Sequence, residues 1–341
     1  MEFVAVKNAS NNHKNNMLQD FLSTIPLNTL KHVKDMDLNI SSPNCNKAVN
    51  ELLQNSVLVG GKRLRPLLTY LVGTLYNQDF KSVAPYAKSI ELVHAASLSH
   101  DDVIDNATTR RGVDSINIQA SNKKAVLAGD YLLADVIVNL TKAGNLELVG
   151  EMAKVIQDLS EGEWIQSDAI ENRDYTSELI ETIAIKKTAS VMSWCCFSPA
   201  ILAGCSRDVV EKSRQMGIDL GIAFQLMDDT LDFSTESDKD ANLDLDNGLV
   251  NAVLFQWLQL NPSMNERYIN GEGLSTIFNG EKIEKAVEIV KNTALSHIDS
   301  ARALLDEIRA AVCTNEKELK AFDKNKKPIL YIFDYLTQRR H

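Results

Sequence analysis

The sequence of 341 residues predicts an all-α protein, and three observations carry that prediction. No proline occurs between Pro85 and Pro199, so nothing there forces a long helix to break. Apolar residues recur in that stretch at helical spacing, for example at Ile90, Val93 and Leu98. Sustained two-residue alternation is absent, and no Asn-Gly turn joins two β-branched runs, so strands are not predicted. We therefore expect a single-domain bundle of about ten helices.

The same spacing predicts where the helices lie along the chain. They are expected over residues 46–59, 64–77, 82–105, 122–141, 147–170, 176–204, 207–233 and 245–260, with two or more between about 281 and 338. Residues 261–280 are rich in Asn, Gly and Ser, which predicts a surface loop. Residues 1–16 contain five asparagines and predict a poorly ordered polar tail. One all-α domain is expected over residues 17–341, because no Pro/Gly/Ser-rich linker divides the chain.

Composition excludes several classes of protein. The net charge of −10 and a pI near 5.2 argue against a general nucleic-acid binder. The five cysteines are odd in number and their spacings suit no zinc site, so reduced cytosolic thiols are expected. No apolar run approaches the roughly 20 residues of a membrane span. The N-terminal residues lack a signal-peptide pattern, and no arginine precedes Arg63, so a cytoplasmic protein is expected.

The sequence Asp-Asp-x-x-Asp occurs twice, each time in a stretch that otherwise predicts a helix. The two motifs consist of Asp101, Asp102 and Asp105, and of Asp228, Asp229 and Asp232. Residues four apart share a helix face, and like charges at that spacing cost about 0.2–0.5 kcal/mol per pair. Mg²⁺ takes one or two carboxylates together with waters and substrate phosphates, so the doubled motif predicts a magnesium-diphosphate site. A solvated acidic face is the alternative, which interleaved apolar residues such as Val103 and Leu231 disfavour.

Basic clusters accompany the two acidic motifs. Gly60-Gly61-Lys62-Arg63-Leu64-Arg65-Pro66 combines a glycine turn with cations at the start of a helix, where anions are favoured. Arg110-Arg111 follows the first motif by five residues, Lys186-Lys187-Thr188 lies in a later helix, and His94 is seven residues before Asp101. Arg offers phosphates a bidentate fork. Each cluster also has a plain structural explanation: solvated charges, a surface arginine pair, an exposed lysine face or a structural histidine.

In this order, these residues resemble the trans-isoprenyl (polyprenyl) diphosphate synthase family. The resemblance runs from about Gly60 to Gly248 and includes GGKRLRP, SLSHDDVIDNATTRRG, LAGDYLL, KKTAS and GIAFQLMDDTLDF. It implies an isoprenoid synthase type of bundle with the active site in its central cavity, the two Asp motifs on facing helices, and a homodimer. Terpene cyclases usually differ in their second motif, so the resemblance favours chain elongation over cyclisation.

The resemblance also implies roles for individual residues. Asp101, Asp105 and Asp228 are implied as the main Mg²⁺ ligands, with Asp102, Asp229 and Asp232 in support, for about three ions per active site. The implied partners of the allylic diphosphate are Arg110, Lys187 and Lys239, and those of isopentenyl diphosphate are Lys62, Arg65, His94 and Arg111. Thr188 and Gln225 are implied to face the carbocation.

The implied reaction needs no protein nucleophile. The allylic C–O bond ionises because Mg²⁺ and basic groups stabilise the departing diphosphate. The double bond of isopentenyl diphosphate, held nearby, attacks the cation, and loss of a proton gives a product five carbons longer. The chain shows no convincing Ser/His/Asp or Cys/His arrangement, which agrees with this chemistry.

The chain departs from the family pattern just after the second motif. The family usually has Gly-Lys and then Asp-Leu-x-x-Gly-Lys-x-Thr-Leu-Pro there. The loop here is about three residues shorter than in that pattern. Asp238 occupies the position of the glycine before the first lysine, Lys239, and Leu249 occupies the position of the second lysine. One diphosphate contact or loop position is therefore expected to differ.

Product length is expected to depend on the residues just before the first motif. A position four residues back lies on the same helix face, about 6 Å deeper. Ser97 and Ala96 are both small there, so an open pocket and a product of C20 or longer are expected. Deeper limits to the growing tail are expected at Val93, Leu133 and Ile137, and Ala96→Phe should shorten the product.

Three other functions compete with this one. A regulatory subunit of a heteromeric synthase is suggested by Leu249 and the short loop, although both Asp motifs are intact. A terpene cyclase would release a hydrocarbon rather than a diphosphate. A purely structural helical protein would show no Mg²⁺-dependent binding of a diphosphate analogue.

Overall fold

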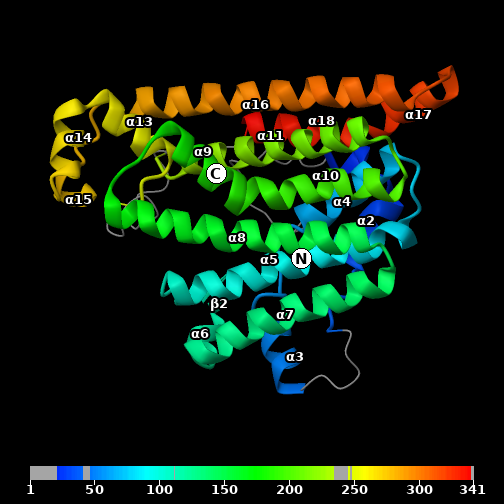
Figure 1. The fold of residues 1–341 in the computed structure, drawn as a ribbon, viewed down its shortest axis with the longest axis horizontal. Coiled ribbons are helices and arrows are strands. Elements are labelled where there is room, and N and C mark those ends of the chain that lie inside the picture. Colours follow the sequence, from blue (N-terminus) through cyan, green and yellow to red (C-terminus); the bar gives the residue numbers. More distant parts are fainter. Residues whose placement is uncertain (1–20, 41–46, 111, 234–244, 246–247, 339–341) are drawn as a thin grey trace, which may run out of the picture. The chain divides into compact units, whose positions relative to one another are not determined.

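The structure is a computed structural model that describes residues 21–40, 47–110, 112–233, 245 and 248–338 (Figure 1). Its helices are α2 (Leu27–Lys34), α3 (Lys47–Gln54), α4 (Leu64–Leu75), α5 (Phe80–Ile104), α6 (Ile116–Gln119), α7 (Asn122–Ala143), α8 (Leu146–Asn172), α9 (Ser177–Ala184), the π-helical turn η1 (Ile185–Ala189), α10 (Ser190–Leu202), α11 (Arg207–Leu231), α13 (Ala252–Leu260), α14 (Pro262–Ile269), α15 (Leu274–Ile277), α16 (Ile283–Val312), α17 (Glu316–Asn325) and α18 (Lys327–Gln338). The strands β1 (Thr109–Arg110) and β2 (Val113–Asp114) form one antiparallel hairpin. The all-α prediction is confirmed, and the polar tail expected over residues 1–16 lies outside the described residues.

Most of the expected helices are present, but α2 was not expected and the helix expected over 46–59 ends at Gln54, and three further segments also differ. The segment expected to be a loop over residues 261–280 contains α14 and α15, because Pro262 suits a first helical position and Tyr268 and Leu274 are buried. The helix expected from residue 245 begins at Ala252, after Gly248 adopts a φ of 73°. The helix expected over 176–204 contains the π-helical turn, where the Ser190 N–H bonds to the Ile185 carbonyl. Among the described residues, no helix is both long enough and apolar enough to cross a bilayer.

The chain divides into two compact units, each built from several segments. The first unit comprises Met1–Ile156, Trp194–Val210 and Val312–Ile329. The second unit comprises Gln157–Ser193, Glu211–Ala311 and Leu330–His341. The first Asp motif belongs to the first unit and the second motif to the second unit. The single domain over residues 17–341 and the facing arrangement of the motifs stay predictions.

Helix α5 is the centre of the first unit. It packs against α4 and α7, and Figure 1 shows α5 and α7 running side by side. Asp79 starts α5 by accepting hydrogen bonds from the N–H groups of Lys81 and Ser82, which would otherwise lack partners. Ile90 and Val93 of α5 are fully buried. This packing against two helices fixes the position of α5, and with it the first Asp motif at its end, within the first unit.

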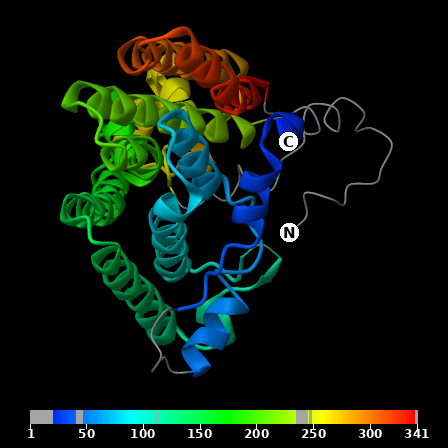
Figure 2. The same cartoon turned by 90° about the vertical axis from the view of Figure 1, so that its right-hand side faces the viewer.

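The second unit is organised around α11. Its helix α16 lies alongside α11 and α18 in both views (Figures 1 and 2). Asp219 of α11 accepts hydrogen bonds from His297 Nδ1 at 2.9 Å and from Ser300 Oγ at 2.6 Å, both from α16. Arg302 of α16 pairs with Asp334 of α18 at 2.6 Å. These contacts hold α11, and the acidic motif at its end, in a defined position within the unit.

Two glycines allow α8 and α11 to approach the π-helical turn closely. A Cβ on Gly162 of α8 would lie 2.8 Å from the side chains of Lys186 and Lys187. A Cβ on Gly221 of α11 would lie 2.3 Å from the Cα of Ala189. Real Cβ atoms do not approach a backbone atom this closely, so α11 packs against this turn only because residue 221 lacks a side chain.

We predict that Gly221→Ala destabilises the protein by about 1–3 kcal/mol, because backbone rather than a flexible side chain must move. The measurement is the free energy of unfolding in urea. The matched control is Gly150→Ala in α8, where an added Cβ meets no atom within 4 Å. This control should be neutral or stabilising by up to about 1 kcal/mol, through helix propensity alone. Equal effects of the two substitutions would contradict the packing argument.

Candidate functional site

The first Asp motif ends helix α5. Asp101 lies half-buried in the last turn, Asp102 is fully buried, and Asp105 is the exposed residue that caps the helix, with its N–H bonded to the Asp101 carbonyl at 2.8 Å. The carboxyl end of a helix carries partial negative charge, so carboxylates there are unfavourable without a cation. The motif is therefore a local concentration of negative charge that requires compensation.

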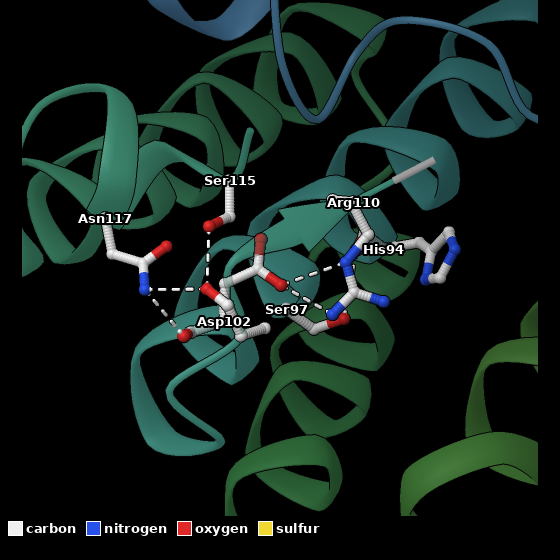
Figure 3. A network of polar contacts seen from close by, with 7 residues as sticks. His94, Ser97, Asp102, Arg110, Ser115 and Asn117 are labelled. Atoms are coloured by element: carbon white, nitrogen blue, oxygen red, sulfur yellow. Dashed lines mark hydrogen bonds and ion pairs between the residues drawn. The ribbon is translucent and has the colours of Figure 1, made fainter. Parts of the chain in front are cut away.

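Arg110 provides part of that compensation (Figure 3). It lies on β1 and reaches back to Asp102, whose Oδ1 accepts hydrogen bonds from Arg110 Nε at 2.9 Å and from Nη2 at 2.5 Å. Asp102 Oδ2 is buried and has no hydrogen-bond partner. Asp102 thus differs from Asp101 and Asp105, because its charge is turned inward onto an arginine.

The turn between Asp102 and Arg110 is held by polar side chains. Asn117 Nδ2 donates to the carbonyls of Asp102 at 3.1 Å and of Ala107 at 2.9 Å. Ser115 Oγ donates to the same Ala107 carbonyl at 2.7 Å. Figure 3 shows these donors on one side of Asp102 and Arg110 on the other. Sequence reasoning did not identify Asn117 or Ser115, because neither residue belongs to an acidic or basic cluster.

The glycine-rich segment before α4 is anchored to α5. Gly60, Gly61 and Arg63 all adopt positive φ, of 68°, 82° and 51°. The Arg63 guanidinium pairs with the buried Glu91 of α5 at 3.0 Å and donates to the Leu58 carbonyl at 2.8 Å. Arg63 therefore joins the glycine-rich segment to α5.

Three residues of the expected isopentenyl diphosphate site lie around this anchor. Lys62 is exposed, Arg65 is half-buried at the start of α4, and His94 is half-buried on α5, three residues after Glu91. The anchor therefore links the segment carrying Lys62 to the part of α5 carrying His94. Ser97 is half-buried one turn further along, whereas Ala96 is fully buried.

The second Asp motif ends helix α11 in the corresponding way. Asp228 is half-buried, Asp229 is buried, and Asp232 follows the last helical residue. Asp229 Oδ2 accepts a hydrogen bond from the Ala252 N–H, the first of α13, at 2.9 Å. Asn251 caps α13 by accepting from the Leu254 N–H and also donates to Asp232 at 3.5 Å. The amino end of α13, which favours anions, therefore contacts this motif.

A chain of hydrogen bonds connects the π-helical turn to the second motif. Thr188 Oγ1 donates to Gln225 Oε1 at 2.7 Å, and Gln225 Nε2 donates to Asp229 Oδ1 at 2.8 Å. Burial raises the pKa of Asp229 to about 7, although the donors Ala252 and Gln225 lower it. The neighbouring Asp232 and Asp228 raise it further. Thr188 and Gln225, both predicted from the sequence, thus lie together beside the motif.

The two lysines of the π-helical turn bind acidic and amide side chains of α8. Lys186 pairs with Asp158 and Glu161, both at 2.9 Å, and the hydrogen bonds that its ammonium group donates to Glu161 and Asp158 raise its pKa. Lys187 forms an ion pair with Glu163 and donates to Gln166 at 3.1 Å. The lysines are therefore not a plain exposed face. Glu163 and Gln166 were missed because the sequence does not indicate which face of α8 meets them.

Two residues of the predicted site, Arg111 and Lys239, lie outside the described residues, so their predicted roles stay predictions. Leu249, at the departure from the family pattern, is half-buried. Among the described residues, no three His, Cys, Asp or Glu side chains gather as a group able to hold a metal ion. Mg²⁺ does not need such a group, because it binds one or two carboxylates together with waters and substrate phosphates.

Comparison with known proteins identifies the family. The Polyprenyl synthetase family pattern matches residues 46–290, a region that includes both Asp motifs and the π-helical turn. The chain belongs to the Polyprenyl synthetase family. The family predicted from the sequence is therefore confirmed.

Individual relatives agree with this assignment. The chain is 32% identical to a prenyl transferase of Cyanidium caldarium over 85% of this chain and 94% of that protein. It is 30% identical to a geranylgeranyl diphosphate synthase of Methanosarcina mazei over 83% of this chain and 87% of that protein. The matches span only 57% of a mitochondrial solanesyl-diphosphate synthase of Oryza sativa and 65% of a decaprenyl-diphosphate synthase of Dictyostelium discoideum.

A solved structure shares the fold along nearly the whole chain. The crystal structure of a decaprenyl diphosphate synthase from Rhodobacter capsulatus aligns with a TM-score of 0.75 and 25% identity. The alignment covers 97% of this chain and 99% of that chain. The polyprenyl synthetase fold therefore extends beyond the residues matched by the family pattern.

We predict that Arg110→Met lowers the free energy of unfolding by about 3–5 kcal/mol, because it leaves Asp102 charged, buried and unpaired. Asp102→Asn combined with Arg110→Met should recover much of that loss. The matched control is Arg207→Met, whose partner Glu147 is 53% exposed, and about 0–1 kcal/mol is expected there. Urea unfolding measures all of these variants. If Arg110→Met cost no more than the control, the ion pair would contribute little to stability.

We predict that Asp229 makes the metal-free protein less stable as pH rises from about 4 to about 7. Its pKa in the folded state is raised, so the carboxyl favours folding while it is protonated, and this contribution is lost as pH rises through the folded pKa. The urea midpoint measured in EDTA should therefore fall more steeply with pH in the unmodified protein than in Asp229→Asn. A shift of this size corresponds to a difference on the order of 4 kcal/mol. Parallel pH profiles would show that Asp229 ionises normally.

Proposed function

We propose that this protein is a trans-prenyltransferase that condenses isopentenyl diphosphate with an allylic diphosphate to give an all-trans polyprenyl diphosphate. The observation that carries the proposal is the pair of Asp-Asp-x-x-Asp motifs, each at the carboxyl end of a 25-residue helix. Family membership supports the same conclusion. The substrates, both of them diphosphates, would meet acidic motifs through a metal and basic side chains directly.

The donor set of the two motifs fits Mg²⁺, because it consists of hard carboxylate oxygens. Asp101, Asp105 and Asp228 would be the main ligands, and Asp229 and Asp232 would support them. When bound, Mg²⁺ would stabilise the negative charge that develops on the departing diphosphate. Asp102 would act differently from these residues, since its full burial and its bonds to Arg110 favour a role in aiming that arginine.

The basic and polar residues would position the two substrates. Arg110, Lys187 and Lys239 would bind the allylic diphosphate, and the contacts of Lys187 with Glu163 and Gln166 support a fixed direction for its side chain. The other diphosphate would bind Lys62, Arg65, His94 and Arg111. Thr188 and Gln225 would present polar oxygens to the allylic cation, and their mutual hydrogen bond supports a shared position. The released diphosphate would accept the proton that is lost.

The resemblance also implies a homodimer, which we include in the proposal. Helix α7 carries three apolar side chains that are between 41% and 55% exposed within the chain, namely Val126, Leu127 and Val138. Burial of such residues against a second copy would remove apolar surface from water. The cytoplasmic location expected from the sequence stays a prediction, and a named relative in Oryza sativa is mitochondrial.

The test of the proposed function is Mg²⁺-dependent incorporation of labelled isopentenyl diphosphate with several allylic primers, resolved by product length. Products of C20 or longer are expected, in line with the geranylgeranyl and decaprenyl names of relatives. Release of a hydrocarbon would instead indicate a cyclase. Binding of a diphosphate analogue without turnover, followed by activity on adding a second subunit, would indicate a regulatory subunit. If the protein bound no diphosphate analogue in the presence of Mg²⁺, it would be a purely structural helical protein.

We predict that Ser97→Phe shortens the product. Ser97 is half-buried on α5, three residues after His94 and four before Asp101, so it shares their helix face. Ala96→Phe should also shorten the product, but Ala96 is fully buried, so a larger side chain there also overpacks the core. Ser97→Ala is the matched control and should keep the original length. An unchanged product from soluble, folded Ser97→Phe would place the tail elsewhere.

A further inference from the structure

The carboxamide of Asn117 connects two parts of the candidate site. Asn117 lies on the short helix α6, and its Nδ2 donates to the main-chain carbonyls of Asp102 and Ala107 at 3.1 and 2.9 Å (Figure 3). The first carbonyl belongs to the last turn of α5 and the second to the turn that follows. Carbonyls at the end of a helix lack partners within it, so a side-chain donor there fixes where the chain goes next.

The segment that Asn117 spans is held both by its own main-chain hydrogen bonds and by groups from outside it. Asn106, between the two carbonyls, adopts a φ of 53°, a left-handed conformation that asparagine tolerates better than most residues and that often ends a helix, and contacts around it hold the chain there. Those contacts are the Asn117 carboxamide, the Ser115 hydroxyl on Ala107 and the Ala107 N–H on the Asp102 carbonyl at 2.9 Å. The path from the first Asp motif to Arg110 is thus supported by the main chain of the turn and by groups from α6 and the residue before it.

Both ends of Asp102 take part in the arrangement. Its main-chain carbonyl receives Asn117, and its side chain receives Arg110. Asp102 is therefore bonded through its main chain to α6 and through its side chain to the hairpin that carries Arg110. A shift of the turn would move Arg110 relative to Asp101 and Asp105, while the rest of α5 remained packed against α4 and α7.

Asparagine suits this position because one nitrogen carries two N–H donors, which can serve two carbonyls at once. Serine offers a single donor, and ionised aspartate offers none. Asn117 Oδ1 is buried and has no hydrogen-bond partner. The side chain therefore places both of its donors on the turn, which favours a positioning task.

We propose that Asn117 is a positioning residue that sets the placement of Arg110 relative to the first Asp motif, and with it the affinity for the allylic diphosphate. The inference rests on the proposed function and deepens it, because it names a determinant of binding at the same site. Asn117 contacts neither substrate in this proposal. It acts through the turn between residues 102 and 110.

The test compares Asn117→Asp with a matched control, Asn325→Asp. Asn325 Nδ2 donates to the carbonyl of Thr74 at the end of α4 at 2.9 Å, in the same unit but outside the site. Both substitutions remove an amide donor from a helix-terminal carbonyl while keeping the side-chain shape. The readouts are the melting temperature, the Kd for inorganic diphosphate with Mg²⁺ by calorimetry, and separate KM values for the two substrates.

Both variants should melt at a lower temperature, as loss of a structural hydrogen bond requires. Only Asn117→Asp should weaken inorganic diphosphate binding and raise the allylic KM, by about tenfold or more, since small misplacements of binding groups have large effects. Its KM for isopentenyl diphosphate should rise less, because Arg111 is the one residue expected to bind that substrate that directly follows Arg110, and Asn325→Asp should alter neither constant. If Asn117→Asp does not fold, Asn117→Ser, with one donor, should show a smaller change in the same direction.

Two results would overturn the proposal. One is normal diphosphate binding and a normal allylic KM in a folded Asn117 variant. The other is an identical pattern in Asn117→Asp and Asn325→Asp, which would reduce Asn117 to a structural residue. Failure of the proposed function is distinguishable from both, because the unmodified protein would then form no prenyl diphosphate from any primer.

Discussion

Two groups of carboxylates at the carboxyl ends of two long helices are the constraint on which the rest of the structure depends. Each helix terminus is already partly negative, and each motif adds three aspartates there. A protein with no use for cations would avoid this arrangement. Here the surrounding residues reduce its cost without neutralising it completely: Arg110 pairs with Asp102, and the first N–H of α13 binds Asp229. Under the proposed function, the other carboxylates would bind a divalent cation.

The two motifs are stabilised by different means. In the first, a charged guanidinium pairs with a buried carboxylate, and a carboxamide holds the connecting turn. In the second, the carboxylate of Asp229 accepts hydrogen bonds from neutral groups, namely the Ala252 N–H and the Gln225 carboxamide. Neutral donors compensate a buried charge less completely than an arginine does, which explains why burial still raises the pKa of Asp229. Repetition of one sequence motif therefore does not mean repetition of one environment.

Close helix packing places the remaining polar groups. Gly162 and Gly221 allow the π-helical turn to approach α8 and α11, and one extra residue in that turn changes which side chains face each neighbour. Lys186 and Lys187 consequently meet acidic residues of α8, while Thr188 meets Gln225. The departure from the family pattern near Leu249 is accompanied by a different support: Asn251 both caps α13 and donates to Asp232. We find in this contact a physical reason why the second motif keeps a defined position next to an altered loop.

The sequence by itself determined the helical class, the approximate limits of α4, α5, α7, α8 and α11, the family and the residue types of the candidate site. These follow from local properties of the sequence, namely the spacing of apolar residues, the scarcity of proline, and short motifs whose residue types indicate their chemistry. It did not determine that residues 261–280 fold into α14 and α15, since burial of Tyr268 and Leu274 is a tertiary effect. Nor did it separate Asp102 from Asp101, or indicate Asn117, Glu163 and Asn251. Only the tertiary structure decided those contacts, because the partners lie on other segments of the chain and spacing along one helix carries no information about what packs against it.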